Sequence, residues 1–303
     1  MNSRLRVCLV ELDGRPSRRL VAARRTLARF VTDVRAANPR AAVDLVITSP
    51  RVGDALPRDC AMYIVTGGRV PLEDSGRAAP QLDQPWTDGL RALLDDIACA
   101  TRAERPQLLA LGLGHALLAS HFELGHLVEW DGERAGVTRF ALTPAGRHAF
   151  CLPRTARALW AFESRRVGVA DLDNRRLAQL GGARLLADPT VHDSFGVRLF
   201  DAVTSLPFLP EADPATVAAW AKTRSEDASA LDRRHYQRTL KLARDPLALG
   251  RTCSLVLPGW LRDSYNAIAR RYLLRRLPLL CDRAAIGTTP SYHDMQMLSG
   301  SYY

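Results

Sequence analysis

Short apolar runs alternate with longer segments of helical periodicity along the N-terminal part of the chain. Strands are expected at residues 5–11, 42–49 and 60–66, each followed by aspartate, proline or glycine. Between the first two, residues 17–37 repeat apolar side chains near one helical face, namely Leu20, Leu27, Phe30 and Val34. Strands and helices that alternate in this way predict a mostly parallel sheet with helices on both faces.

The sharpest break in this pattern lies in the stretch from Pro106 to Ser120, which reads P-Q-L-L-A-L-G-L-G-H-A-L-L-A-S. The apolar run 108–111 stops at Gly112, and a helical pattern resumes after it. A buried strand, a tight glycine bend and the start of a helix are expected there. Hydrolases of the α/β type place a nucleophile on such an elbow, where the following backbone N–H groups can hold an oxyanion.

The elbow resembles that of class I glutamine amidotransferases, most closely the type found beside GMP synthases. The family reads G-I-C-F-G-H-Q-L-L-A where this chain reads A-L-G-L-G-H-A-L-L-A. The family's cysteine falls on Gly112, and its glutamine-contacting Gln falls on Ala116. The resemblance implies an α/β, flavodoxin-like class I amidotransferase fold, with a mostly parallel sheet flanked by helices and a C-terminal helical extension.

Further family motifs follow in the same order along residues 1–225. The strand that ends in I-V-T-G-G occupies the place of an oxyanion-hole turn, which makes Gly67 and Gly68 candidates, although a plain strand-to-loop turn is an equal alternative. P-W-x-x-x-L-R begins at Pro85, and L-T-P-x-G lies within residues 137–146. These ordered matches are more specific than a lone glycine pattern.

The remaining catalytic positions of the family are altered in this chain. Where the family has S-H-x-D-x-V, this sequence places Glu163 at the His position and Arg165 at the acidic one. Where the family ends its triad in Q-F-H-P-E, this sequence reads P-F-L-P-E, so the general base falls on Leu209 and the acid survives as Glu211. The triad positions Gly112, Leu209 and Glu211 are therefore degenerate.

Glutamine hydrolysis by this fold needs a thiolate to attack the amide and a histidine to transfer the proton. Gly112 has no side chain and Leu209 carries no proton. Loss of a triad nucleophile lowers turnover by about 10⁶-fold in a serine protease that uses a comparable triad. The resemblance therefore implies no catalytic residue and no ordinary glutaminase activity.

Two hypotheses remain for the elbow pocket. The first is a catalytically degenerate protein that serves as a non-catalytic subunit, scaffold or ligand sensor for a biosynthetic or regulatory partner. The second is an enzyme with altered hydrolase- or transferase-type chemistry that uses Glu211, Glu163 or His115. Neither requires a metal or a cofactor. The candidate ligand-binding residues are Gly67, Gly68, Leu113, His115, Glu163, Arg165 and His192.

Composition adds bounds on class and compartment. Apolar residues make up 47% of the 303 residues, which is enough for a large core. No apolar run approaches the ~20 residues of a membrane span, and the N-terminus lacks a signal-peptide pattern, so a cytoplasmic protein is expected. The six scattered cysteines lack a C-x-x-C pair and are expected to be free thiols.

The basic charge is concentrated near the C-terminus. Residues 231–283 hold 12 Arg or Lys against 4 Asp or Glu, which accounts for +8 of the net +10. We expect an amidotransferase-like domain at 1–228 and a basic helical extension at 229–303, with helices at 231–249 and 261–280 separated by the apolar segment C-S-L-V-L-P-G. Arginines usually cover apolar surface, so a protein partner or a second copy is favoured over nucleic acid or a membrane surface. A small-molecule ligand at the elbow remains an alternative.

Overall fold

The central element is a seven-stranded sheet in the order β2-β1-β3-β4-β9-β8-β7. A computed structural model describes residues 4–13, 18–37, 42–67, 84–186, 195–226 and 229–272. Five strands run parallel: β1 (Arg4–Glu11), β2 (Ala42–Thr48), β3 (Met62–Thr66), β4 (Gln107–Leu111) and β9 (Val203–Leu206). The short strands β8 (Val197–Leu199) and β7 (Ala183–Arg184) complete one edge in antiparallel pairing. The expected strands are confirmed.

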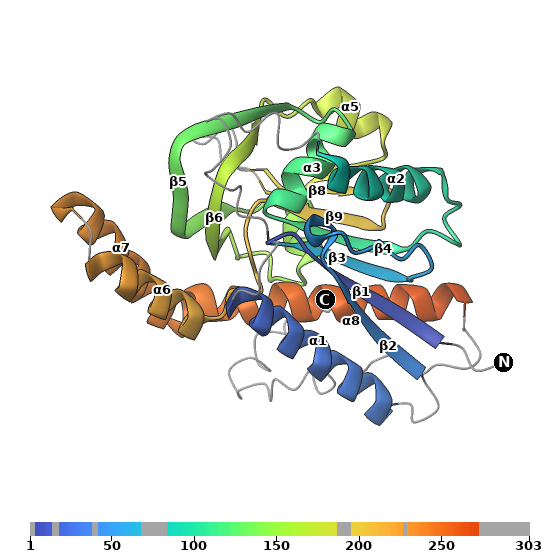
Figure 1. Cartoon of the computed structure of the whole chain (residues 1–303), viewed down its shortest axis with the longest axis horizontal. Coiled ribbons are helices and arrows are strands. Elements are labelled where there is room, and N and C mark those ends of the chain that lie inside the picture. The colour runs from blue at the N-terminus through green and yellow to red at the C-terminus, as the bar shows by residue number, and fades with distance from the viewer. Residues whose placement is uncertain are drawn as a thin grey trace.

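Helices cover both faces of this sheet (Figure 1). On one face lie α1 (Arg18–Ala37) and α8 (Arg251–Tyr272), and on the other lie α2 (Pro85–Cys99), α3 (Leu113–His121) and α5 (Asn174–Gln179). The side chains of each face form a separate hydrophobic core. Along β4, Leu109 and Leu111 pack in the first core, which lies under α1 and α8. Leu108 and Ala110 pack in the second core, which lies under α2, α3 and α5. Because both faces are buried, the strand is a continuous apolar run rather than an alternating one.

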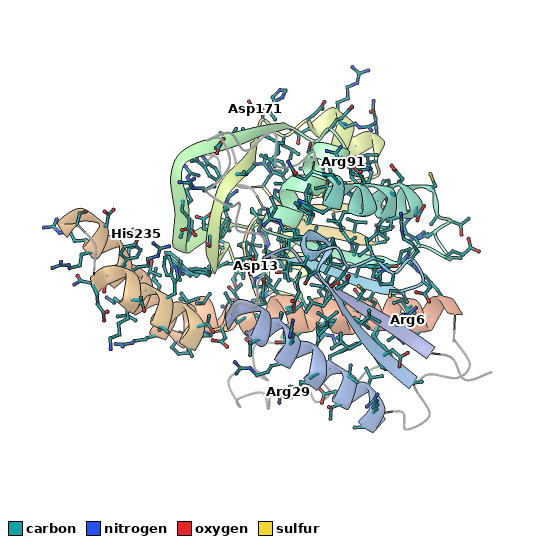
Figure 2. All side chains as sticks on the ribbon, in the orientation of Figure 1. Arg6, Asp13, Arg29, Arg91, Asp171 and His235 are labelled. Carbon is teal, nitrogen blue, oxygen red and sulfur yellow. The ribbon has the colours of Figure 1, made fainter. Side chains whose placement is uncertain are left out.

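A long antiparallel ribbon stands beside the sheet. It consists of β5 (His126–Ala141) and β6 (Ala158–Ala170), joined through α4 (Pro144–Ala149), and it forms the bent green element of Figure 1. The helices α6 (Pro214–Glu226) and α7 (Ala230–Arg244) come after β9 in the chain. His235 on α7, labelled in Figure 2, donates from Nε2 to the Ala135 carbonyl at 2.6 Å. This contact ties α7 to β5.

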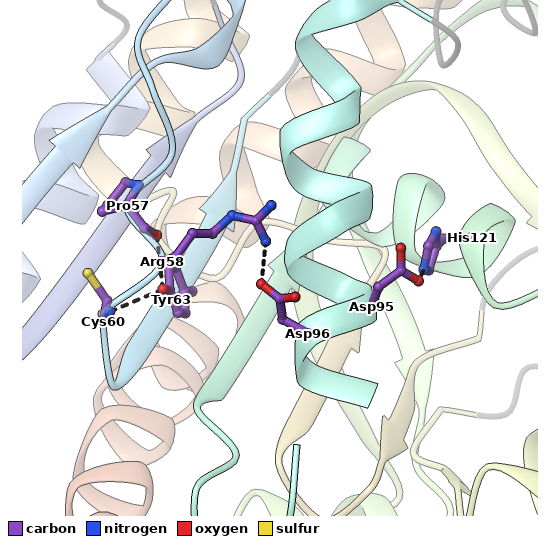
Figure 3. A network of polar contacts seen from close by, with 7 residues as sticks. All are labelled: Pro57, Arg58, Cys60, Tyr63, Asp95, Asp96 and His121. Carbon is purple, nitrogen blue, oxygen red and sulfur yellow. Dashed lines mark hydrogen bonds and ion pairs between the residues drawn. The ribbon is translucent and has the colours of Figure 1, made fainter. Parts of the chain in front are cut away.

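Polar contacts fix the helices that flank the elbow (Figure 3). Arg58, which follows the 3₁₀ turn η1 (Pro50–Val52), pairs with Asp96 of α2 at 2.6 Å. His121 at the end of α3 contacts Asp95 of α2 at 3.0 Å. The Tyr63 hydroxyl donates to the Pro57 carbonyl at 2.9 Å, which holds the start of β3. The loop, β3, α2 and α3 are thereby joined by side chains as well as by the core.

The C-terminal helices differ from the expectation in where they break. The segment C-S-L-V-L-P-G was expected to separate two helices, but it lies inside α8, with Pro258 within the helix. The break falls earlier, at the π-helical turn η3 (Pro246–Gly250). Asp245 precedes a proline and is extended, with φ −81° and ψ 113°, because the ring of Pro246 disfavours a helical residue before it. Residues 273–280 of the second predicted helix lie outside the described residues.

Helix α8 contributes to the same core as the sheet. Its side chains Leu261 and Tyr265 are buried against the first core, and Tyr265 meets Phe30 of α1 edge to face with ring centroids 6.1 Å apart. The division of the chain at residue 228 stays a prediction, although this core includes residues from both sides of it. Within the described residues, no helix has the length and apolarity that crossing a membrane requires.

Truncation of Leu261 tests the packing of α8. Leu261→Ala removes a fully buried side chain, and we expect the free energy of unfolding to fall by about 2–5 kcal/mol. The matched control is Leu247→Ala, because Leu247 is 78% exposed and should change stability by less than about 0.5 kcal/mol. Urea unfolding followed by circular dichroism measures both. Equal effects of the two variants would show that α8 does not pack as described.

Candidate functional site

The elbow between β4 and α3 has the expected geometry. β4 ends at Leu111, Gly112 adopts φ 55° and ψ −112°, and α3 begins at Leu113. The Gly112 N–H donates to the Leu206 carbonyl at 3.0 Å, which anchors the bend to β9. The predicted order of strand, tight bend and helix between residues 108 and 119 is thus confirmed. A residue with a side chain would be strained at this positive φ.

Leu209 occupies the space over the bend. A Cβ placed on Gly112 would lie 3.0 Å from Leu209 Cδ2. Leu209 is 1% exposed, and its backbone N–H donates to the Phe162 carbonyl of β6 at 2.8 Å. Gly112 and Leu209, which the sequence resemblance assigns to the nucleophile and base positions, therefore lie together, and Leu209 covers the bend with an apolar side chain. That contact has no group able to attack a carbonyl or to move a proton.

Glu211, the remaining acid, is bound inside the protein. Its side chain is buried, and Oε1 accepts a hydrogen bond from the Thr66 hydroxyl at the end of β3. Gly67 follows with φ 89°, and a Cβ there would lie 2.8 Å from Asp13 Oδ1. The turn after β3 and the end of β1 thus converge beside the elbow. Gly68, the second glycine of the predicted oxyanion turn, lies outside the described residues.

A cysteine from α8 also approaches this region. Cys253 Sγ donates to the Ala212 carbonyl at 3.3 Å. Burial, with the negative charges of Glu211 and Asp213, raises the pKa of Cys253 to about 12. The group is therefore a neutral thiol near pH 7, and thiolate is the nucleophilic form. Cys253 lies on α8 rather than on the elbow.

His115 is a neutral, interior residue. It is 1% exposed, and its Nδ1 lies 2.7 Å from Ser205 Oγ on β9. Burial, and secondarily the charge of Arg165, lowers the pKa of His115 to about 3. Its ring meets Phe195 edge to face at a centroid distance of 5.3 Å. Within the described part of the chain its Nε2 has no hydrogen-bond partner.

The two altered positions on β6 bind each other. Arg165 Nε donates to Glu163 Oε2 at 2.9 Å, and the Thr138 hydroxyl donates to Glu163 Oε1 at 2.7 Å. The guanidinium also stacks over Trp130, with its carbon 4.9 Å from the ring centroid. Both charged side chains are buried. Removal of either partner alone would leave an unpaired buried charge, so the two residues depend on each other where the ribbon passes Leu209.

Several neighbours of the elbow were not predicted from the sequence, namely Asp13, Thr66, Ser205, Cys253 and Trp130. Asp13 and Thr66 carried a usable signal, because the C-terminal ends of parallel strands meet at one edge of a sheet. Ser205, Cys253 and Trp130 carried none, since their partners are distant in sequence. His192 lies outside the described residues. Whether the remaining candidates bind a ligand stays a prediction, and among the described residues no three His, Cys, Asp or Glu side chains could hold a metal ion together.

The fold is that of glutamine amidotransferases, as solved structures show. A glutamine amidotransferase from Thermotoga maritima is similar with a TM-score of 0.55 and 17% identity, over 88% of this chain and 97% of that one. A glutamine amidotransferase from Methylobacillus flagellatus gives a TM-score of 0.58 and 17% identity, over 89% and 96% of the two chains. No protein-family model matches the sequence, and no curated protein matches it. At this identity the likeness concerns the fold.

Substitution of Gly112 tests the elbow and its contact with Leu209. Gly112→Ala should lower the free energy of unfolding by about 1–3 kcal/mol, because alanine is strained at φ 55°. Combined with Leu209→Ala, the loss should be smaller than the sum of the two single losses by about 0.5 kcal/mol or more, since the clash disappears.

The control for this cycle is Gly259→Ala, because a Cβ there meets nothing within 4 Å and the residue lies in α8. That variant should be neutral or more stable by up to about 1 kcal/mol. Chemical unfolding of the four proteins measures the cycle. A Gly112→Ala protein as stable as the parent chain would contradict the described bend.

The burial of His115 predicts a pH dependence of stability. Between pH 6.5 and about 3 the unfolded chain binds a proton at this imidazole that the folded chain does not bind. Stability should therefore fall as the pH is lowered through this range, by up to about 1.4 kcal/mol per pH unit from this group. His115→Gln should show a shallower slope of unfolding free energy between pH 6 and pH 4. Identical slopes would contradict the buried neutral state.

Proposed function

We propose that this chain is a catalytically degenerate member of the glutamine amidotransferase fold that acts as a non-catalytic subunit, scaffold or ligand sensor for a biosynthetic or regulatory partner. The contact between Gly112 and Leu209 carries the proposal. At the positions where the family places its cysteine and histidine, this chain places a bare backbone bend and a leucine that packs over it.

The surroundings of the bend support the same conclusion. Glu211 binds Thr66, Glu163 binds Arg165 and Thr138, and His115 binds Ser205. General acid–base catalysis needs a group whose pKa lies near the working pH and that can reach the substrate. The pKa of His115 lies far below neutrality, and its ring is enclosed by the core. These groups stabilise the fold around the bend.

The alternative of altered chemistry requires Glu211, Glu163 or His115 to reach a substrate. Each of them is at least nine-tenths buried. Each also has a hydrogen-bond partner inside the protein. A substrate would have to break these bonds before it met any reactive group, so the observations favour the non-catalytic role.

A glutaminase assay tests the loss of chemistry. The purified full chain should release no ammonia from glutamine above a protein-free blank, because the nucleophile and base are both missing. Loss of the nucleophile alone lowers turnover by about 10⁶-fold in a serine protease that uses a comparable triad. An active glutaminase in the same buffer serves as the positive control. Turnover by this chain would contradict the proposal, and its loss in Cys253→Ser would identify that thiol as the source.

The partner is tested in the same preparation. The tagged full chain should either self-associate in sedimentation velocity or enrich a specific protein from extracts of the cells that naturally produce it, at about 0.15 M salt. An untagged preparation controls for background. A strict monomer that enriches no protein and whose melting temperature responds to no amino acid or nucleotide would refute the proposal.

A further inference from the structure

A cavity lined partly by polar side chains lies at the opposite end of β4 from the elbow. Gln107 begins β4 and Gly112 follows its end, so the two sites are separated by roughly 16 Å along the strand. The cavity lies between the sheet and α8 and has about 50 Å³ of space open to water. Because one water molecule needs about 10–15 Å³ of such space, the cavity can hold a few waters or a small organic molecule.

Two buried nitrogen donors of this cavity have no acceptor. Gln107 is only 4% exposed, and its side-chain Nε2 has no hydrogen-bond partner among the described residues. Arg198 on β8 also lines the cavity, and its Nε likewise has none within the described part of the chain. A buried donor without a partner costs about 1–3 kcal/mol. The cavity therefore has an unsatisfied demand for an acceptor.

The cavity wall carries one basic and one acidic side chain, Arg198 and Asp263. Arg198 donates from Nη2 to the backbone carbonyl of Asp201 at 3.1 Å, and no carboxylate pairs with it among the described residues. Asp263 is bound by Arg262 Nε at 3.0 Å. Because Asp263 is already paired, the guanidinium of Arg198 can bind an added anion. Its planar N–H groups match the oxygens of a carboxylate.

The remaining wall fits the carbon skeleton of such an anion. Thr204 of β9 and Ser264 of α8 contribute hydroxyl groups, and both residues are more than nine-tenths buried. Phe150 and Trp260 contribute apolar surface. We propose that this cavity binds a small carboxylate whose oxygens accept hydrogen bonds from Gln107 Nε2 and Arg198 Nε. The site lies away from the elbow and does not depend on the function proposed above.

The proposal assigns Gln107 a role in binding at the expense of stability. If a ligand supplies the missing acceptor, Gln107→Leu should weaken binding while leaving the unliganded fold as stable or more stable, because an unpaired donor is replaced by a hydrocarbon of similar size. A purely structural glutamine would show the reverse, a loss of stability without an effect on ligand. The two properties together separate these roles.

Isothermal titration calorimetry of the full chain with sodium propionate, against sodium chloride at equal ionic strength, tests the site. Propionate should bind saturably, and Arg198→Ala and Gln107→Leu should each weaken it by at least about tenfold. Ala267→Leu, which fills the cavity from α8 without removing a polar group, should do the same. Arg175→Ala, an exposed arginine on α5, is the matched control and should change nothing.

Alanine and inorganic phosphate form the comparison arms. Alanine binding as tightly as propionate, or more tightly, supports the carboxylate assignment and indicates that an amino acid can occupy the site beside Asp263. Binding of phosphate but not of propionate would overturn the assignment. So would the absence of saturable binding, or propionate binding that the Arg198, Gln107 and Ala267 variants leave unchanged.

Discussion

One backbone conformation, that of Gly112, sets the arrangement of the whole site. Its φ of 55° turns the chain from β4 into α3 within a single residue. This turn carries Leu113 and His115 into the interior and leaves a space that Leu209 fills. The fold needs only the turn, which glycine adopts without strain. Catalysis would need a side chain at the turn and a proton acceptor in place of Leu209.

Several polar groups around the bend bind one another. Glu163 with Arg165, Glu211 with Thr66, and His115 with Ser205 each form a buried pair. Buried polar groups of this kind are costly when one partner is removed, so they hold the ribbon, the sheet and α3 in register. At the far end of β4, Gln107 Nε2 and Arg198 Nε have no acceptor among the described residues, and both residues line a cavity.

Helix α8 extends from the elbow region to the cavity at the start of β4. Cys253 near its start contacts Ala212 beside Glu211, while Ser264 farther along lines the cavity at Gln107. Its central residues share a core with β1, β3 and β4. The C-terminal residues thus complete the sheet's covering layer as well as bearing basic charge. A ligand in the cavity would contact the sheet and this helix at once, which would couple occupancy to the position of α8.

The sequence by itself determined the strands, the elbow and the glycine at its bend, because these depend on local apolar patterns and on the identity of single residues. Residues 42–48, 62–66 and 107–121 follow the prediction closely. It misplaced the helix break near Pro258, since packing of a long apolar face overrides the weaker local signal of one proline. Only the tertiary structure decided that Leu209 covers Gly112, that Glu163 binds Arg165, and that Gln107 and Arg198 share a cavity. Those contacts join segments that are distant along the chain or are set by side-chain direction, and no periodicity encodes them.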